Sequence, residues 1–278
     1  MCQVKCKVAA VIPRSLPPTV FERAPLLYFI AQVRFGAVLQ MREHVPPIQE
    51  ALRKAGYPVF RHAIQPAITV ESGQPKLERV DLFNFVSADN SSGVILTTEF
   101  VSYHTVKYET FDTEIPKIRE ALQTVNDAAD LHVIERCGLR YVDVVCPEAP
   151  NELPAYLTPS ALGWQSEEFG VKPEIYSSIF QGRSELGTLV VKFATGKAPG
   201  VMPPDLAPSS LAIPADKWPA GAEIMTLDFD HFVQMRETFD VDKAMETLGG
   251  LHDAIARAFN HAITPTARKL WGEHSAAV

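Results

Sequence analysis

The sequence Val-Ile-Glu-Arg-Cys-Gly-Leu-Arg-Tyr-Val-Asp-Val-Val at residues 133–145 is typical of a β-strand, because it is rich in β-branched and aromatic residues and contains no proline. Its centre, Leu139-Arg140-Tyr141, resembles Val33-Arg34-Phe35, which lies 106 positions earlier in the chain. A strand pattern that occurs twice at this separation predicts an internal repeat.

Further matches follow in the same order along the chain. They are Val45-Pro46 with Leu153-Pro154, Gly56-Tyr57 with Gly163-Trp164, Glu99-Phe100 with Asp228-Phe229, and Glu-Thr-Phe-Asp at 109–112 with the same tetrapeptide at 237–240. The separation grows by about twenty residues between the early and the late matches, which indicates an insertion in the second copy. The sequence therefore predicts two copies, 25–131 and 132–272, in one continuous domain that a peripheral segment, 1–24, precedes.

Each copy is predicted to have the element order β-α-β-β-β-α. The first copy is expected to contain strands at 26–39, 62–71, 79–87 and 93–106, a short helix from Pro46-Pro47 to Gly56, and a helix that Asp112 or Thr113 caps. The second is expected to contain a strand at 133–145, a short helix at 153–163, a hairpin of 175–183 with 187–194, a strand at 224–235, and a long helix that Asp240 caps and Gly249-Gly250 weakens.

These elements predict an α+β fold with pseudo-twofold symmetry, in which about eight mostly antiparallel strands carry four helices on one face. The opposite face is then open, and we expect function there. The proline-rich segment 196–221 is predicted to be an unpacked surface loop, either a lid or docking segment or a tolerated insertion.

Composition excludes several classes of protein. The chain of 278 residues is 46% hydrophobic and has a net charge of −7 from 26 Lys and Arg against 33 Asp and Glu, so it favours a packed, acidic domain that does not bind nucleic acid. No apolar run is long enough to span a membrane, which predicts a soluble cytoplasmic protein. Cys2 and Cys6 lack a second ligand pair and no glycine-rich cofactor motif occurs, so neither a metal nor a cofactor is predicted.

The strand around Arg136-Cys137-Gly138-Leu139-Arg140-Tyr141 resembles that of a sporadically distributed, uncharacterised prokaryotic family. Two further hallmarks of the family occur in the same order, an early strand Pro25-Leu26…Gln32-Val33-Arg34-Phe35 and a C-terminal helix Leu251-His252-Asp253…Phe259…Ile263-Thr264. The resemblance extends from about Ala24 to Trp271, with Asp143 at a position where the family often has Asn. It implies one shared architecture and no catalytic residue.

Arginines give the sharpest candidate site. Arg136 and Arg140 are four apart on one strand and therefore point to the same face, and Arg34 is the repeat counterpart of Arg140. One interpretation is an anion pocket built from the three arginines. The favoured interpretation is structural ion pairs within the sheet, with Glu99 the first candidate partner of Arg140 and Asp228 its counterpart for Arg34.

The remaining candidates are two histidines and two tyrosines. His104 and His231 are candidate acid–base groups, and Tyr103 and Tyr108 are candidate aromatics of a groove on the open face. No catalytic motif joins them, so we predict a non-catalytic binding or accessory protein that uses the open face for a peptide, a protein partner, a second copy or a small ligand. The alternative is an enzyme or binding protein for a small carboxylate or phosphate, with the arginines as its anion site.

Overall fold

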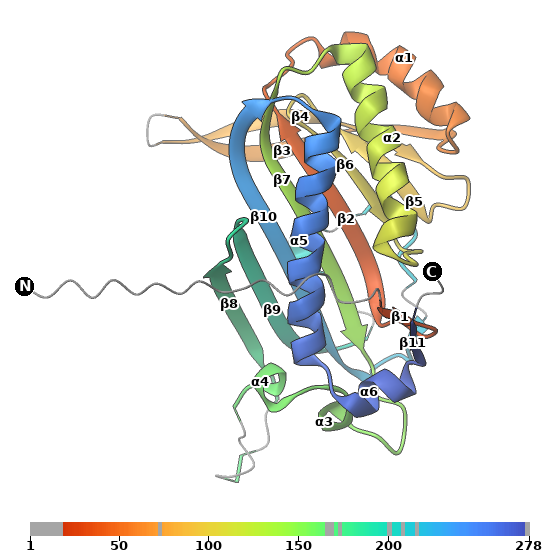
Figure 1. Cartoon of the computed structure of the whole chain (residues 1–278), viewed down its shortest axis with the longest axis vertical. Helices are drawn as coiled ribbons and strands as arrows, with labels where there is room; N and C mark the ends of the chain where they lie inside the picture. The colour runs from red at the N-terminus through yellow and green to blue at the C-terminus, as the bar shows by residue number, and fades with distance from the viewer. Residues whose placement is uncertain are drawn as a thin grey trace, which may run out of the picture.

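The computed structural model describes residues 19–71, 74–164, 170–171, 174–198, 202–206, 209–214 and 217–275. In this part of the chain the predicted α+β class is confirmed. One antiparallel sheet has nine strands in the order β3-β4-β5-β6-β2-β7-β10-β9-β8, and a separate pair joins β1 to β11 (Figure 1). The middle strand is β2, and β7 lies beside it with residues 137–145 buried.

The strands are β1 (Thr19–Phe21), β2 (Leu26–Phe35), β3 (Val59–Glu71), β4 (Gln74–Val86), β5 (Ser92–Leu96), β6 (Phe100–Thr105), β7 (Val133–Val145), β8 (Ser177–Arg183), β9 (Thr188–Lys197), β10 (Glu223–Thr238) and β11 (Glu273–Ser275). The helices are α1 (Met41–Lys54), α2 (Phe111–Ala129), α3 (Leu153–Tyr156), α4 (Pro159–Leu162), α5 (Val241–Ala262) and α6 (Pro265–Leu270), with a 3-10 turn, η2, at Pro204–Leu206.

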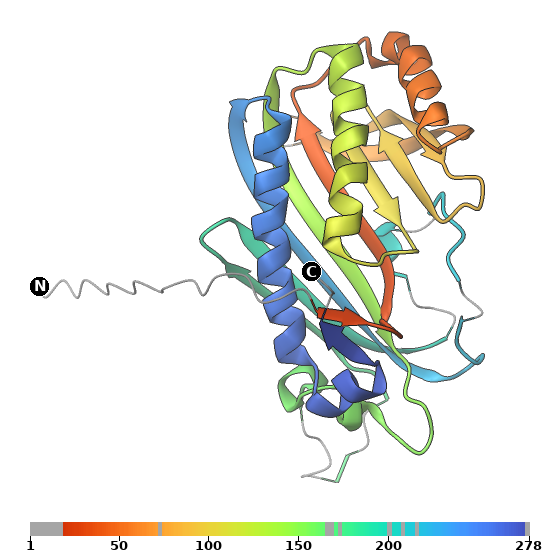
Figure 2. The ribbon, with the colours of Figure 1, turned by 45° about the vertical axis from the view of Figure 1, so that its right-hand side comes forward.

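Helices α1, α2 and α5 lie on one face of the large sheet, which we call the helix face (Figures 1 and 2). On β7, Cys137, Leu139 and Tyr141 point to this face and join the main hydrophobic core. The long helix is capped as predicted, because the Asp240 side chain accepts a hydrogen bond from the backbone N–H of Lys243. Alternation along β7 places Arg136, Gly138 and Arg140 on the opposite face.

That opposite face, which we call the loop face, is partly covered. Leu211 and Trp218 of the proline-rich segment are buried against Tyr28, Val142 and their neighbours in a second hydrophobic cluster. The expectation of an unpacked loop at 196–221 is therefore wrong for the described part of that segment, because its apolar side chains Leu211 and Trp218 are buried against the sheet. This part of the chain also contains no helix with the length and apolar character needed to cross a membrane.

Two other expectations in the first half are wrong in detail. The single strand expected at 93–106 is a hairpin of β5 and β6, because the Thr97 hydroxyl accepts hydrogen bonds from the backbone of Glu99 and Phe100 and closes a turn. Helix α2 is capped by Thr110, whose side chain exchanges hydrogen bonds with Thr113, rather than by Asp112 or Thr113.

Helix α1 starts at Met41, so the Pro46-Pro47 pair lies inside it rather than at its start. The helical acceptors that these prolines leave unpaired belong to Arg42 and Glu43, which are exposed and open to water. In the second half, the predicted helix at 153–163 is two short helices, α3 and α4. The predicted strand at 133–145 coincides with β7.

The pair of β1 and β11 was not expected, since residues 1–24 were predicted to be peripheral. Thr19–Phe21 pairs with Glu273–Ser275 beside the end of α6. Cys2 and Cys6 lie outside the described residues.

Two glycines give opposite predictions for stability. A Cβ at Gly249 in α5 meets nothing within 4 Å, whereas a Cβ at Gly187 in the β8–β9 turn would lie 2.1 Å from the carbonyl oxygen of Phe232. We expect Gly249→Ala to raise the free energy of unfolding by about 0.5–1 kcal/mol. Gly187→Ala should lower it by about 1–3 kcal/mol through overpacking. Urea unfolding measures both, and equal effects of the two substitutions would contradict the packing described here.

Candidate functional site

Arg140 is held by two carboxylates on the loop face. Its Nε lies 2.7 Å from Oδ1 of Asp228 and its Nη2 lies 2.8 Å from Oδ2, a bidentate pair in which Asp228 is 4% exposed. Asp205 of η2 forms a second ion pair with the same guanidinium. The predicted ion pair within the sheet exists, but Glu99 is not the partner of Arg140, and Asp228 is not the partner of Arg34.

Glu99 pairs instead with Arg34. The β5–β6 turn holds Glu99 beside the end of β2, where its carbonyl oxygen accepts from the Phe35 N–H at 2.8 Å. Each arginine therefore finds a carboxylate in its own half of the chain. The Arg34 pair is half exposed, so it contributes little stability compared with the buried pair of Arg140.

Arg136 lies flat along its own strand. Its guanidinium is 4.4 Å from the ring centroid of Phe232 and donates to Gln32 Oε1 at 2.9 Å. It also crosses Gly138, where a Cβ would lie 2.9 Å from Nη1 and the arginine side chain would have to shift. The three arginines therefore do not form one pocket, although Arg34, Arg136 and Arg236 border a hollow of about 290 Å³.

Both histidines proposed as acid–base groups are completely buried. His104 contacts the Tyr28 hydroxyl at 2.7 Å on the loop face, and burial lowers its pKa to about 3. On the helix face, His231 Nδ1 donates to the carbonyl oxygen of Leu251 at 3.1 Å, and burial lowers its pKa as well. The two histidines lie on opposite faces and serve as hydrogen-bonded core residues in the structure.

Tyr103 and Tyr108 lie on the helix face rather than on the open face where a groove was expected. Tyr103 is buried in the core and donates to Glu114 Oε2 at 2.6 Å. Tyr108 follows β6 and lines a pocket between α2, α5 and the sheet.

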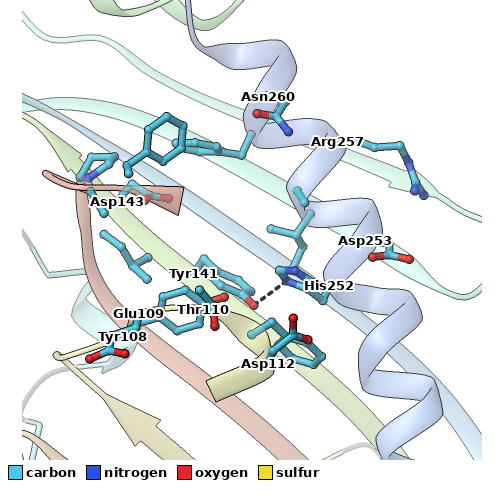
Figure 3. A pocket seen from close by; sticks show the side chains of 18 of the residues that line it. Tyr108, Glu109, Thr110, Asp112, Tyr141, Asp143, His252, Asp253, Arg257 and Asn260 are labelled. Carbon is cyan, nitrogen blue, oxygen red and sulfur yellow. Dashed lines mark hydrogen bonds between the residues drawn. The ribbon is translucent and has the colours of Figure 1, made fainter. Parts of the chain in front are cut away.

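This helix-face pocket has a volume of about 490 Å³ (Figure 3). Its floor comes from β7, and its sides come from the start of α2, from α5, and from the segment that joins β1 to β2. The aromatic side chains that line it are Phe21, Tyr108, Phe111, Tyr141 and Phe259, and the polar ones are Glu109, Thr110, Asp112, Asp143, His252, Asp253, Arg257 and Asn260.

Asp143 is the unusual group of the pocket. It is 5% exposed, and in the described part of the chain no donor forms a hydrogen bond or ion pair with its carboxyl group. Burial raises the pKa of Asp143 to about 8, with Asp228 adding to the effect and Lys217 opposing it. Every side-chain oxygen that is sealed from solvent in the described part of the chain has a hydrogen-bond partner, so the Asp143 carboxyl reaches the pocket space, where a ligand can pair with it.

His252 stands across the pocket from Asp143 (Figure 3). Its Nδ1 lies 2.8 Å from the Tyr141 hydroxyl, and its ring stacks on Phe111 at a centroid distance of 4.3 Å. Burial lowers the pKa of His252 to about 4, so the ring is neutral near pH 7. The pair provides a rigid, neutral, hydrogen-bonding wall.

The sequence did not reveal this pocket. Asp143 stood out only as a departure from a family pattern, and the adjacent His252-Asp253 pair gave no ligand spacing. The useful signal was the alternation of side chains along β7. An acidic residue two positions after Tyr141 must face the helices as Tyr141 does. In the described part of the chain, no group of three or more His, Cys, Asp or Glu side chains is placed to hold a metal ion.

A double-mutant cycle tests whether the buried pair is structural. We expect Arg140→Met alone to lower the free energy of unfolding by about 3–5 kcal/mol, because it leaves the Asp228 carboxylate buried without a partner. The double substitution with Asp228→Asn should cost less than the sum of the single ones. Asp205→Asn removes the exposed partner and should cost about 1 kcal/mol or less. Additive losses in urea unfolding would contradict the pair.

A second experiment tests the state of Asp143. An aspartate in the unfolded chain has a pKa of about 4, whereas burial raises the pKa of the folded Asp143 carboxyl to about 8. The folded state binds more protons in this window, so stability falls with rising pH by up to about 1.4 kcal/mol per unit. Asp143→Asn should remove this slope. The buried histidines act in both proteins and cancel in the difference, and parallel pH profiles of the two proteins would refute the prediction.

No family model, curated protein or solved structure matches this chain, so the family resemblance remains a prediction and the site rests on its own geometry.

Proposed function

We propose that this protein is a non-catalytic binding protein and that the helix-face pocket is its ligand site. The observation that carries the proposal is the pocket itself, whose volume of about 490 Å³ falls in the range of small-molecule sites. Five aromatic and several aliphatic side chains line it together with eight polar ones, a mixed lining that suits an organic molecule with polar groups.

The helix face is favoured as the ligand site over the loop face, on which function was first expected. The segment that contains Leu211 and Trp218 covers part of the loop face, and Asp205 already neutralises Arg140 there. Among the described residues, no side chain forms an ion pair with the Asp143 carboxyl at the helix-face pocket, and this carboxyl borders the pocket space.

An anion-binding function at the loop face is the second candidate. The observation in its favour is the register of β2 and β7, which places Arg34 directly opposite Arg136 at the edge of the hollow of about 290 Å³. Like charges that face each other across two strands repel, and the carboxylates of Glu99 and Asp230 already offset part of this repulsion. An enzyme has less support, because His104 on this face and His231 on the helix face are both committed to internal hydrogen bonds.

We also infer that the two halves of the chain are copies of one unit. A twofold axis relating each residue to the one 106 positions later must pass between Gln32 and Gly138, and these two residues are opposite each other in the central pair of strands. The same shift of 106 positions relates Ile30 to Arg136 and Arg34 to Arg140. It therefore exchanges the cross-strand pair Ile30–Arg140 with the cross-strand pair Arg34–Arg136. Outward from that axis, the strands descend in chain order on both sides, β6 to β3 and β10 to β8.

A fragment screen with a blocked variant tests the binding function. Fragments that bind the folded state raise the melting temperature, and a hundredfold excess over the dissociation constant stabilises by about 2.7 kcal/mol. Ala256 of α5 lines the pocket, so Ala256→Trp should abolish the shifts by filling the space. Leu39→Trp is the control, because Leu39 is 88% exposed and lies outside the pocket. A screen without hits, or hits that survive in Ala256→Trp, would overturn the proposal.

A further inference from the structure

We propose that the ligand of the helix-face pocket carries an organic cation, an ammonium group, which pairs with the carboxylate of Asp143. This inference rests on the proposed binding function and names the class of its ligand. It starts from the mismatch between a buried acid and its surroundings.

The first argument is the missing counter-charge. Asp143 belongs to the helix-face set of β7, two residues from Tyr141, so its carboxyl group points to the pocket rather than to the Arg140 cluster on the other face. Lys217 influences its pKa, but no ion pair joins the two side chains in the described part of the chain. A cation that enters the pocket would form the ion pair with the Asp143 carboxylate that the described side chains do not form.

The second argument is the charge around the pocket. Glu109, Asp112 and Asp253 line it together with Asp143, and Arg257 is the basic side chain among the lining residues. His252 adds no positive charge near pH 7, because burial lowers its pKa to about 4. The field inside the pocket is therefore negative, and it favours a cation over a carboxylate or phosphate.

The third argument is the aromatic wall. The rings of Tyr108 and Tyr141 meet edge to face with centroids 5.6 Å apart, and both line the pocket. Burial raises the pKa of both hydroxyls, so the rings stay neutral. Aromatic faces beside a carboxylate attract ammonium groups, which shed water more readily than metal ions do. This combination favours an organic cation over a hydrated metal ion.

Matched pairs of probes test the inference by calorimetry. Each quaternary ammonium probe is compared with its neutral carbon isostere, for example choline with 3,3-dimethylbutan-1-ol, together with a larger aromatic pair. We expect each cation that binds to do so at least about tenfold more tightly than its isostere. Asp143→Asn should reduce this ratio to about one. Glu185→Gln is the control, because it removes the same charge from an exposed position outside the pocket and should leave the preference unchanged.

Proton release gives a second readout that a structural role for Asp143 would not produce. The other titratable side chains that line the pocket are Tyr108 and Tyr141 on the sheet side, Glu109 and Asp112 at the start of α2, and His252, Asp253 and Arg257 from α5, and Asp228 and Lys217 also influence the pKa of Asp143. The pKa of Asp143, about 8, lies close above neutral pH. Binding of a non-titrating ammonium near pH 7 should therefore release close to one proton, and near pH 9.5 almost none.

The outcomes separate this inference from the function on which it rests. If neutral fragments bind in the pocket while no ammonium probe is preferred, the cation is wrong and the binding function stands. If neither kind of probe binds, both proposals fall. A preference for cations that persists in Asp143→Asn would also overturn the role of this carboxylate.

Discussion

The alternation of side chains along β7 is the constraint on which the rest of the structure depends. This strand lies between β2 and β10 near the middle of the sheet, and its residues 137–145 are buried, so each of those side chains must be accommodated in one of two layers. Arg140 falls on the loop face and Asp143 on the helix face. Both residues are largely buried, but their surroundings differ.

Arg140 is satisfied within the protein, because Asp228 from the neighbouring strand and Asp205 from the proline-rich segment surround its guanidinium. That arrangement fixes register and holds the segment against the sheet, and it leaves nothing for a ligand to supply. Asp143 is 5% exposed, and its carboxyl group, which has no partner in the described part of the chain, borders a pocket that a cation can enter. The contrast between the two groups locates function on the helix face and structure on the loop face.

Much of the fold is predictable because it follows from local patterns. Residues 133–145 form a strand because they are rich in β-branched and aromatic residues and contain no proline. Asp240 marks the start of α5 through its capping hydrogen bond. The carboxylate partner of each arginine was not predictable from the sequence. Glu99 reaches Arg34 only because Thr97 closes a turn that divides the expected strand 93–106. The pocket was hidden for a related reason, since Asp143, Tyr108 and His252 converge from distant elements whose spacing in the chain carries no signal.

The pKa of Asp143 is the quantity on which this account depends most directly. A carbon-detected NMR titration of its side-chain carboxyl measures that pKa in the free protein and in the presence of a saturating quaternary ammonium ion. The account predicts a value near 8 in the free protein, as burial without a partner requires, and a marked fall when the cation is bound. A free carboxyl that titrates near about 4, as in an exposed aspartate, would contradict it.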